Sequence, residues 1–405
     1  MWEQLVEHEM RVAYLRSREP LTLRITDQVH ARYMEAAAGS RKTSQPSLSM
    51  RTPIWLDCDT GHDDAFAILL AARSRDVNLL GISTVYGNAP LENTTFNTRA
   101  ILKAIGREEV PVYAGASKPL QRETAHAPDI HGAGGLDGTQ SLPQPTVPAR
   151  LEDAVDEMHR ALRAEPAGTA WLVAVGALTN VAILLERYPD IVHHLAGLSV
   201  MGGAIGGGFS DAPMGTIHGE EAAHVVFSNP ALARKTILIP LDLTHQFIAT
   251  SEVQMGLLFG QTTTGKAERT MANVTPVRRL FFEILTFFAK TYSDVFGLKT
   301  GPPTHDPLAV AATFRPDLFV YSKEPKDGQN ERFSVEVVTK GEHGASDEAR
   351  GGNSQCGRTI VQPLSQGESG VTIPRSLDAP ALWELLEGCL STCGNAENAQ
   401  SPDVK

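Results

Sequence analysis

The sequence predicts an α/β fold: a single large, open, mostly parallel sheet with helices on both faces. From residue 53 onward, short apolar runs alternate with helical patterns, and the strand-length runs lie at 54–58, 78–87, 170–175 and 195–201. Apolar strands that are separated by helices indicate a parallel sheet that is covered on both sides. The chain has no repeat of fixed period, which argues against a solenoid or a propeller.

Each predicted strand is followed by a helix. Apolar residues that recur every three or four positions place a stripe on one helix face, and this stripe packs on the sheet. The predicted helices cover residues 65–72, 93–105, 178–188, 220–227, 276–296 and 308–314. The helix at 276–296 carries an aromatic stripe, and such a stripe is more often part of the core than of a ligand pocket.

The ends of the chain differ from this regular part. Residues 1–52 are charged and end in a polar run, 39–49, with the composition of a linker. We therefore predict an N-terminal extension and linker at 1–52, one large domain at 53–395 and a short tail at 396–405.

Composition and charge argue against several classes of protein. Lys and Arg number 36 against 47 Asp and Glu, which gives a net charge of −11 and disfavours a nucleic-acid-binding role. No apolar run approaches the roughly 18 residues of a membrane helix. The four cysteines have neither the spacing of a zinc site nor that of a disulfide framework. We expect a cytoplasmic protein that binds neither membranes nor nucleic acids.

All four predicted strands end in polar or glycine residues. These ends read Asp57-Cys-Asp-Thr-Gly, Tyr86-Gly-Asn, Val175-Gly-Ala and Met201-Gly-Gly. Ligands of open parallel sheets bind at the carboxyl ends of the strands. We therefore expect these four ends to line one crevice that holds the site.

The first strand end carries an unusual density of acidic residues. Asp57, Asp59, Asp63 and Asp64 place four carboxylates within eight residues. One of them could simply cap the following helix. Four anions in a half-buried turn repel one another unless a cation or a hydroxyl-rich ligand satisfies them. Calcium, which takes six to eight oxygen ligands, fits such a cluster, and magnesium is the alternative.

The first two of these aspartates also allow a different interpretation. An Asp-x-Asp pair after a strand is typical of haloacid-dehalogenase phosphatases, where the first Asp is the nucleophile. In this chain Gly61 stands where those enzymes have Thr or Val, and the later Asp63-Asp64 pair is foreign to their pattern. The phosphatase therefore remains a weaker alternative.

A second polar motif, Thr304-His-Asp-Pro307, precedes the predicted helix at 308–314. Asp306 could be an N-cap that is followed by proline at the first helical position. It could equally be a partner of the acidic cluster. His305 could donate a proton near neutral pH.

Taken together, the motifs resemble the inosine-uridine-preferring nucleoside hydrolases, with a pattern similar to that of fungal uridine nucleosidases. The resemblance covers about residues 53 to 390. The motifs that carry it are Asp57-Cys-Asp-Thr-Gly-His-Asp-Asp64, Val85-Tyr-Gly-Asn88, Asp129-Ile-His131-Gly, Val175-Gly-Ala-Leu-Thr-Asn180, Val200-Met-Gly-Gly203, Leu241-Asp-Leu-Thr-His245 and Thr304-His-Asp-Pro307.

The resemblance implies a calcium-dependent enzyme that hydrolyses the N-glycosidic bond of ribonucleosides in nucleoside salvage. It implies that Asp59, Asp64, Asp306 and the carbonyl oxygen of Val175 are ligands of the calcium ion. Asp59 would also be the base for the metal-bound water, and His305 would protonate the leaving base. It implies a homodimer or homotetramer that acts on a small ribonucleoside.

The remaining roles that the resemblance implies concern the substrate. Asp63 and Asn88 would hold the ribose hydroxyls, Met201 would pack in the ribose pocket, and His131 would lie near the substrate. Phe288 and Tyr292, on the aromatic helix, are candidates for the base pocket. Asp57 would lie next to the calcium ligands and help to orient them through hydrogen bonds, without contacting the ion itself.

One part of the family pattern is missing from the chain. After the Met-Gly-Gly strand, family members carry a run whose Asn and Glu hold the ribose, whereas this chain has 209–219 and then Glu221-Ala-Ala. The metal ligands are retained, so an alternative is a catalytically impaired homologue that binds calcium and ribose. Glu220 or Asp211 could replace the lost contacts.

We also predict that the segment 115–150, rich in Gly and Pro, is a mobile flap.

Overall fold

The computed structural model describes six parts of the chain: residues 51–206, 209, 220–260, 271–322, 330–341 and 356–393. The chain divides into two units, 1–51 and 52–405. The predicted extension, apart from its last two residues, and the tail lie outside the described residues, so the domain boundaries stay predictions. The following paragraphs concern the second unit alone.

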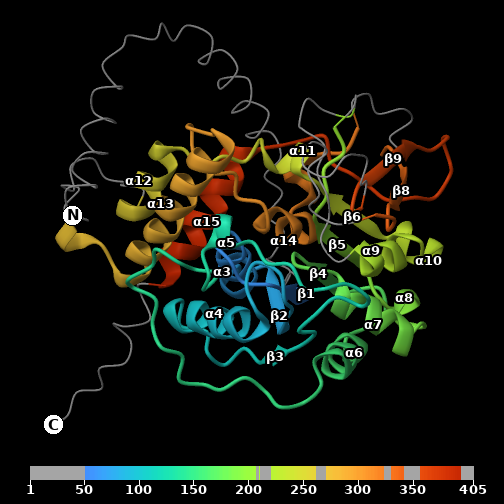
Figure 1. Ribbon diagram of the computed structural model, residues 1–405, viewed down its shortest axis with the longest axis horizontal. Coiled ribbons are helices and arrows are strands. Elements are labelled where there is room, and N and C mark those ends of the chain that lie inside the picture. The colour runs from blue at the N-terminus through green and yellow to red at the C-terminus, as the bar shows by residue number, and fades with distance from the viewer. Residues whose placement is uncertain are drawn as a thin grey trace, which may run out of the picture. The chain divides into compact units, whose positions relative to one another are not determined.

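The centre of this unit is a six-stranded parallel sheet (Figure 1). Every neighbouring pair in the order β3-β2-β1-β4-β5-β6 runs in the same direction. The predicted α/β fold is therefore confirmed. The strands are β1 (Thr52–Cys58), β2 (Val77–Thr84), β3 (Val112–Ala114), β4 (Trp171–Ala174), β5 (Gly197–Met201) and β6 (Thr236–Ile239).

The apolar pattern predicted the four inner strands and missed both edge strands. β3 has three residues, and the apolar run of β6 covers only 237–239 before Pro240, so both runs are shorter than the run at 170–175 that revealed β4. The order reverses between β1 and β4, because β2 and β3 lie on one side of β1 and β5 and β6 lie beyond β4. In such sheets the ligand crevice lies at this reversal, outside the carboxyl ends of the strands.

The two faces of the sheet belong to separate hydrophobic cores. In β1, Ile54 and Leu56 contribute to one core, whereas Trp55 contributes to the other. This alternation follows from the two-residue period of a strand. Both faces are covered, as the uninterrupted apolar runs predict.

The long helices sort onto these two cores. The first core receives α3 (Asp64–Arg73), α4 (Leu91–Ala104), α13 (Pro276–Phe296), α14 (Pro307–Phe314) and α15 (Ala379–Cys393). The second receives α6 (Ala154–Ala164), α7 (Thr179–Arg187) and α9 (Glu220–Phe227). α12 (Ser251–Phe259) also contributes to the first core, through Leu257. The helices of one turn are α5 (Pro128–His131), α8 (Ile191–His194), α10 (Pro230–Ala233) and α11 (Leu241–Thr244).

Two small antiparallel pairs complete the described strands. β8 (Phe333–Val337) pairs with β9 (Thr359–Pro363), and β7 (Phe319–Val320) pairs with β10 (Ser376–Leu377). None of the helices in the described ranges is both long and apolar enough to cross a membrane.

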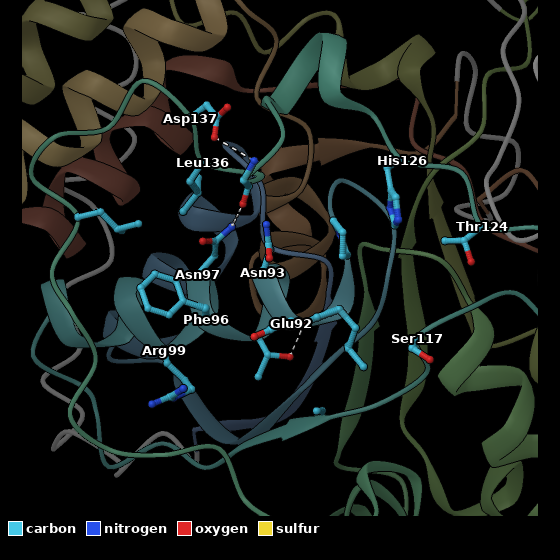
Figure 2. A pocket seen from close by; sticks show the side chains of 16 residues that line it. Glu92, Asn93, Phe96, Asn97, Arg99, Ser117, Thr124, His126, Leu136 and Asp137 are labelled. Carbon is cyan, nitrogen blue, oxygen red and sulfur yellow. Dashed lines mark hydrogen bonds between the residues drawn. The ribbon is translucent and has the colours of Figure 1, made fainter.

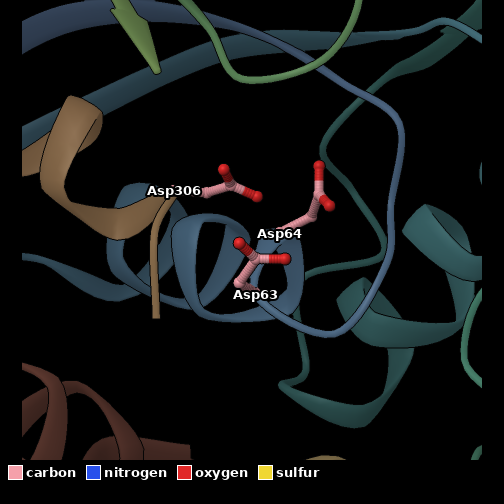
Figure 3. Close-up of side chains that lie close together, drawn as sticks. All are labelled: Asp63, Asp64 and Asp306. Carbon is pink, nitrogen blue, oxygen red and sulfur yellow. The ribbon is translucent and has the colours of Figure 1, made fainter. Parts of the chain in front are cut away.

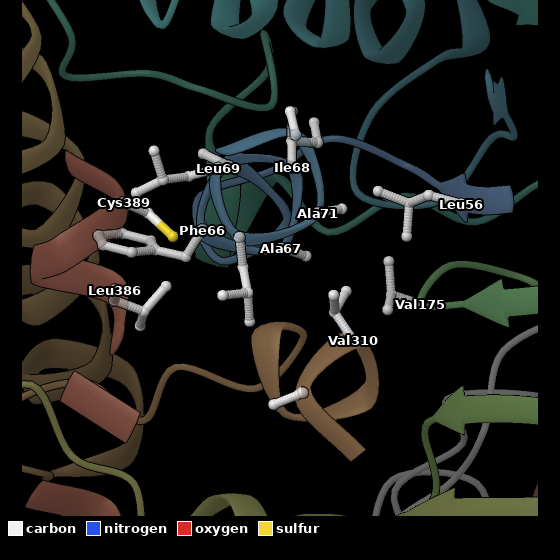
Figure 4. Close-up of a cluster of buried hydrophobic side chains, with 14 of the residues drawn as sticks. Leu56, Phe66, Ala67, Ile68, Leu69, Ala71, Val175, Val310, Leu386 and Cys389 are labelled. Atoms are coloured by element: carbon white, nitrogen blue, oxygen red, sulfur yellow. The ribbon is translucent and has the colours of Figure 1, made fainter. Parts of the chain in front are cut away.

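The first core is densest around α3, the helix that begins directly after the acidic loop. Phe66 is fully buried there, near Leu386 and Cys389 of α15 (Figure 4). Its ring packs edge-on against Phe281 of α13, with ring centroids 4.9 Å apart. It also meets the edge of Trp383 of α15 at 6.3 Å. One aromatic ring thus joins three helices behind the site.

We predict that Phe66→Ala lowers the free energy of unfolding by about 3–5 kcal/mol, because the substitution leaves a cavity among three helices. Urea denaturation that is followed by circular dichroism measures this change. Phe296→Ala, at a side chain that is 53% exposed, is the control and should change stability by less than about 0.5 kcal/mol. Equal effects of the two substitutions would contradict the prediction.

Candidate functional site

The loop between β1 and α3 is held in shape by its own carboxylates. Asp64 accepts hydrogen bonds from the backbone N–H groups of Gly61, at 2.8 Å, and Asp59, at 3.1 Å. Asn88, which follows β2, donates its backbone N–H to Asp59 Oδ2 at 2.8 Å and its side-chain amide to Asp64 Oδ2 at 3.0 Å. The ends of β1 and β2 therefore meet, as predicted.

Three carboxylates converge beside this loop. Asp63, Asp64 and Asp306 each offer an oxygen atom within 4.8 Å of the other two (Figure 3). Asp63 and Asp306 occupy the N-cap positions of α3 and α14, yet neither side chain forms a capping hydrogen bond. The interpretation of these residues as simple helix caps is therefore wrong.

Asp59 lies next to this group. A Cβ atom added to Gly176, one residue beyond Val175, would come within 2.8 Å of Asp59 Oδ1. Glycine at this position lets the chain after β4 approach the carboxylate closely. The Val175–Gly176 segment and the acidic loop therefore border the same space, at the reversal of strand order.

The electrostatics of the cluster favour a bound cation. Burial, followed by repulsion from Asp64, raises the pKa of Asp63 to about 8. Burial also raises the pKa values of Asp59 and Asp306 well above their usual range. In the described ranges no lysine or arginine forms an ion pair with these aspartates. A set of buried carboxylate oxygens without a cationic side chain suits a hard divalent cation.

Asp57 lies behind this group, inside the sheet. It is fully buried, and its Oδ1 accepts hydrogen bonds from the Ser83 hydroxyl and, at 2.8 Å, from the Asn180 side chain. Its Oδ2 has no hydrogen-bond partner among the described residues, and burial raises its pKa to about 7. A carboxyl enclosed in this way is not placed to attack a phosphate ester, which argues against the phosphatase alternative.

Two histidines meet at the acidic loop, His62 within the loop and His131 from α5. His131, on α5, is buried, and its Nδ1 lies 3.2 Å from Nδ1 of His62. The Nε2 atom of His62 lies 3.0 Å from the Asp137 carbonyl oxygen. Burial lowers the pKa of His62 to about 4 and that of His131 well below its usual value. Both rings are therefore neutral at pH 7.

His305 is held between two hydroxyl groups. Its Nδ1 lies 2.6 Å from Thr244 Oγ1, and its Nε2 lies 2.7 Å from the Tyr292 hydroxyl. Burial, followed by the neighbouring His245, lowers the pKa of His305 to about 3. The neutral ring can supply one N–H proton, and Tyr292 lies directly in contact with it.

Helix α13 brings the aromatic candidates to these histidines. The ring of Phe288 lies 5.4 Å from that of His62 and 5.5 Å from that of His131, and it meets Tyr292 edge-on at 4.8 Å. Phe288 and Tyr292 are also buried. The aromatic stripe is thus both part of the core and a wall of the site.

Met201 is half-buried at the carboxyl end of β5.

The segment that should carry the missing run lies outside the described residues, apart from Phe209. Beyond it, the Arg122 side chain donates to Glu221 at 2.7 Å and lies 3.7 Å from Glu220. Glu220 and Glu221 are therefore tied to the 115–150 segment.

The segment 115–150, predicted to be a mobile flap, is anchored along its length. Arg122 holds it to α9 as described above. Glu283 of α13 accepts hydrogen bonds from residues 140 and 141, and Glu108 accepts hydrogen bonds from Thr146. The segment is therefore attached to its surroundings at three places, and its mobility stays a prediction.

A hollow of about 960 Å³ lies between this segment and α4 (Figure 2). Phe96, Asn97 and Asp137 are among its lining residues, and none of the clustered aspartates is. Asn97 donates hydrogen bonds both to the Thr60 carbonyl oxygen, at 3.1 Å, and to that of Gly134, at 2.9 Å. The hollow thus shares a wall with the site but is separate from it.

Four residues at the site were assigned no role from the sequence: His62, Asn180, Thr244 and Glu283. His62, Asn180 and Thr244 lie inside motifs that carried the resemblance, so their positions were already marked. Glu283 is an acidic residue on the buried face of the aromatic helix. An acid within an apolar stripe was a signal that could have revealed it.

Known proteins show the same combination of motifs and fold. The family model described as inosine-uridine preferring nucleoside hydrolase matches residues 54–384. The uridine nucleosidase of Saccharomyces cerevisiae is 36% identical over 345 residues, which cover 83% of this chain and 95% of the yeast protein. A pyrimidine-specific ribonucleoside hydrolase of Escherichia coli K12 is 36% identical over 272 residues, which cover 67% of this chain and 82% of that protein.

A solved structure supports the same assignment. The purine-preferring ribonucleoside hydrolase of Gardnerella vaginalis has a TM-score of 0.67 and 25% identity, and the match covers 85% of this chain and 99% of that one. The family match extends over most of the chain, and the yeast relative exceeds 30% identity. The chain belongs to the inosine-uridine preferring nucleoside hydrolases, a family of enzymes that hydrolyse ribonucleosides.

Proposed function

We propose that the protein is a calcium-dependent hydrolase that cleaves the N-glycosidic bond of uridine- or inosine-type ribonucleosides in nucleoside salvage. The observation that supports this most directly is the convergence of three buried carboxylates at the reversal of strand order. The names of the yeast, bacterial and Gardnerella relatives point to the same chemistry on pyrimidine or purine nucleosides.

Asp59, Asp64, Asp306 and the Val175 carbonyl oxygen would hold the cation. Asp63, which joins the converging group, serves both the cation and the sugar hydroxyls. When bound, calcium supplies positive charge that orients hydroxyl groups and lowers the pKa of a water molecule. Asp59 accepts the proton of the attacking water, because its side chain borders the space between β1 and β4.

The same cluster stabilises the reacting sugar. Cleavage of an N-ribosyl bond develops positive charge on the ribose ring, as in glycoside hydrolysis. Buried carboxylates that cannot relax toward solvent are preorganised for that charge. Asn88, which already bonds Asp59 and Asp64, fixes the orientation of both carboxylates.

His305 and Tyr292 act on the leaving base. The 2.7 Å contact between Nε2 and the hydroxyl lets a proton pass along the pair. Burial holds the pKa of Tyr292 above its usual value, so its hydroxyl stays protonated and can donate a hydrogen bond to Nε2 of His305. Phe288 and His131 would enclose the base beside them.

A second candidate is a calcium- and ribose-binding homologue with impaired catalysis. The observation that favours it is the absence, from the sequence, of the run that anchors the ribose in other family members. Each lost hydrogen bond removes about 0.5–1.5 kcal/mol. If these contacts form mainly in the transition state, several of them together cost orders of magnitude in rate.

We predict that uridine or inosine turnover requires the cation and the carboxylate cluster. A chelator, or the substitution Asp306→Ala, should reduce base release at least about 100-fold, because the cation loses a ligand or is removed. Base release is measured by ultraviolet absorbance. Asp294→Asn is the control, since Asp294 lies on the exposed surface of α13 and pairs with Lys290.

Two results separate the candidates. Turnover that is abolished by chelator and restored by calcium supports the hydrolase. Calcium binding in the absence of turnover supports the impaired homologue instead. Hydrolysis of a phosphate ester without nucleoside cleavage would contradict both.

The raised pKa values predict a pH dependence of stability. Asp63 keeps its proton up to about pH 8 in the folded protein but only to about 3.8 when unfolded. Stability without divalent cations should therefore fall as pH rises from 6.5 toward 8. The buried histidines oppose this fall only in part. Unfolded, with a pKa of 6.5, each is half protonated at pH 6.5 and loses that proton by pH 8, which adds about 0.4 kcal/mol of stability per histidine and is outweighed by the carboxylates.

Thermal unfolding of chelated protein measures this effect. The Tm should be lower at pH 8 than at pH 6.5, and calcium should raise it more at pH 8, where protons compete less for the carboxylates. A Tm of the chelated protein that rises over this interval would contradict the electrostatic account.

We predict that Tyr292→Phe lowers kcat about 10- to 1000-fold while the protein stays folded, because the hydroxyl that contacts His305 is lost. Steady-state kinetics with uridine and inosine measure the change. Tyr188→Phe, which removes a surface hydroxyl bonded to Asp156, is the matched control. Unchanged kcat in Tyr292→Phe would exclude the hydroxyl from the proton path.

A further inference from the structure

We propose that Glu283 is a positioning residue that fixes the His131 loop onto helix α13 and thereby sets the place of His131 in nucleoside cleavage. The inference rests on the proposed function and adds a residue to it. Glu283 is only 5% exposed and lies outside the acidic cluster.

Glu283 receives three hydrogen bonds from one short stretch of the loop. Its Oε2 accepts the backbone N–H groups of Gln140, at 2.8 Å, and Ser141, at 2.9 Å. Its Oε1 accepts the Ser141 hydroxyl at 2.9 Å. Hydrogen bonds to a carboxylate are about twice as strong as neutral ones, so this is the firmest attachment between loop and helix.

The same helix presses on the loop one turn further along. Gly138 has a φ of +83°, and a Cβ atom there would overlap the Phe287 ring. Phe287 also stacks on His62 at 4.9 Å. The loop between His131 and Ser141 is therefore held to α13 both by hydrogen bonds and by close packing.

Hydrogen bonds within the loop connect the anchored residues 140–141 to His131. Asp137 accepts the backbone N–H groups of Ala133 and Gly134, both at 3.0 Å, and donates its own N–H to the His131 carbonyl oxygen at 3.2 Å. This closes a tight turn of seven residues that begins at His131. A displacement at residues 140–141 therefore moves the turn that carries the histidine.

Helix α13 also holds the opposite side of the site. Glu283, Phe287, Phe288 and Tyr292 all belong to this helix, with Phe287 one turn beyond Glu283 and Tyr292 one turn beyond Phe288. Glu283 and Tyr292 are nine residues apart, or about 14 Å along the axis. Because Tyr292 contacts His305, one rigid helix fixes His131 relative to His305.

The test compares Glu283→Ala, Glu283→Gln and an otherwise similar control. Alanine removes both acceptor oxygens and with them all three hydrogen bonds, whereas glutamine keeps an oxygen for the two N–H groups and an amide for the Ser141 hydroxyl. Glu387→Ala is the control, because Glu387 is as deeply buried and bonds Arg278 of the same helix, at 2.6 and 3.0 Å, away from the loop.

We expect Glu283→Ala to lower kcat/KM about 10- to 100-fold, the cost of a displacement of about 1 Å in an active site. Glu283→Gln should stay within about threefold of the unaltered protein, and Glu387→Ala within about twofold despite a lower Tm. Hydrogen exchange at Gln140 and Ser141 should be faster only in Glu283→Ala.

A double-mutant cycle with His131→Ala identifies the route of the effect. If Glu283 acts through His131, the double variant should be no slower than His131→Ala alone. Fully multiplicative losses, or kcat/KM within twofold in Glu283→Ala, would overturn the inference. Absence of turnover in the unaltered protein would instead count against the proposed function, and the exchange measurement would still decide whether Glu283 anchors the loop.

Discussion

The arrangement of the molecule depends on one electrostatic constraint, the gathering of buried carboxylates at the reversal of strand order. Asp63, Asp64 and Asp306 lie within 4.8 Å of one another, and burial raises their pKa values. Such a group is stable only with protons or with a cation. The parallel sheet brings the acidic loop after β1 next to the end of β4, and α14 delivers the third carboxylate.

A second theme is the role of α13. Its aromatic face serves as core near Phe281 and as site wall near Phe288, and its Tyr292 hydroxyl contacts His305. Because a 21-residue helix is rigid, groups that attach to it hold fixed relative positions. The acidic cluster therefore supplies the charge, while α13 fixes the histidines around it.

Much of this was predictable from the sequence, and the limits have physical causes. The alternation of apolar runs and helical patterns predicted the parallel sheet, and the strand-end rule placed Asp59 and Asp64 at its crevice. Asp306 was assigned to the same crevice by the family resemblance. The pattern missed β3 and β6, because their apolar runs are only three residues long, whereas the run at β4 extends over 170–175. It could not show that Glu283 anchors the segment 115–150, because contacts between residues about 140 positions apart depend on tertiary packing.

The most direct test is a calorimetric titration of metal-free protein with calcium at pH 8, in buffers with different ionisation enthalpies. The account predicts one calcium ion per chain and release of protons on binding, because the carboxyls with raised pKa values must lose them to coordinate the ion. Absence of calcium binding, or binding without proton release, would contradict the assignment of these carboxylates as the cation site.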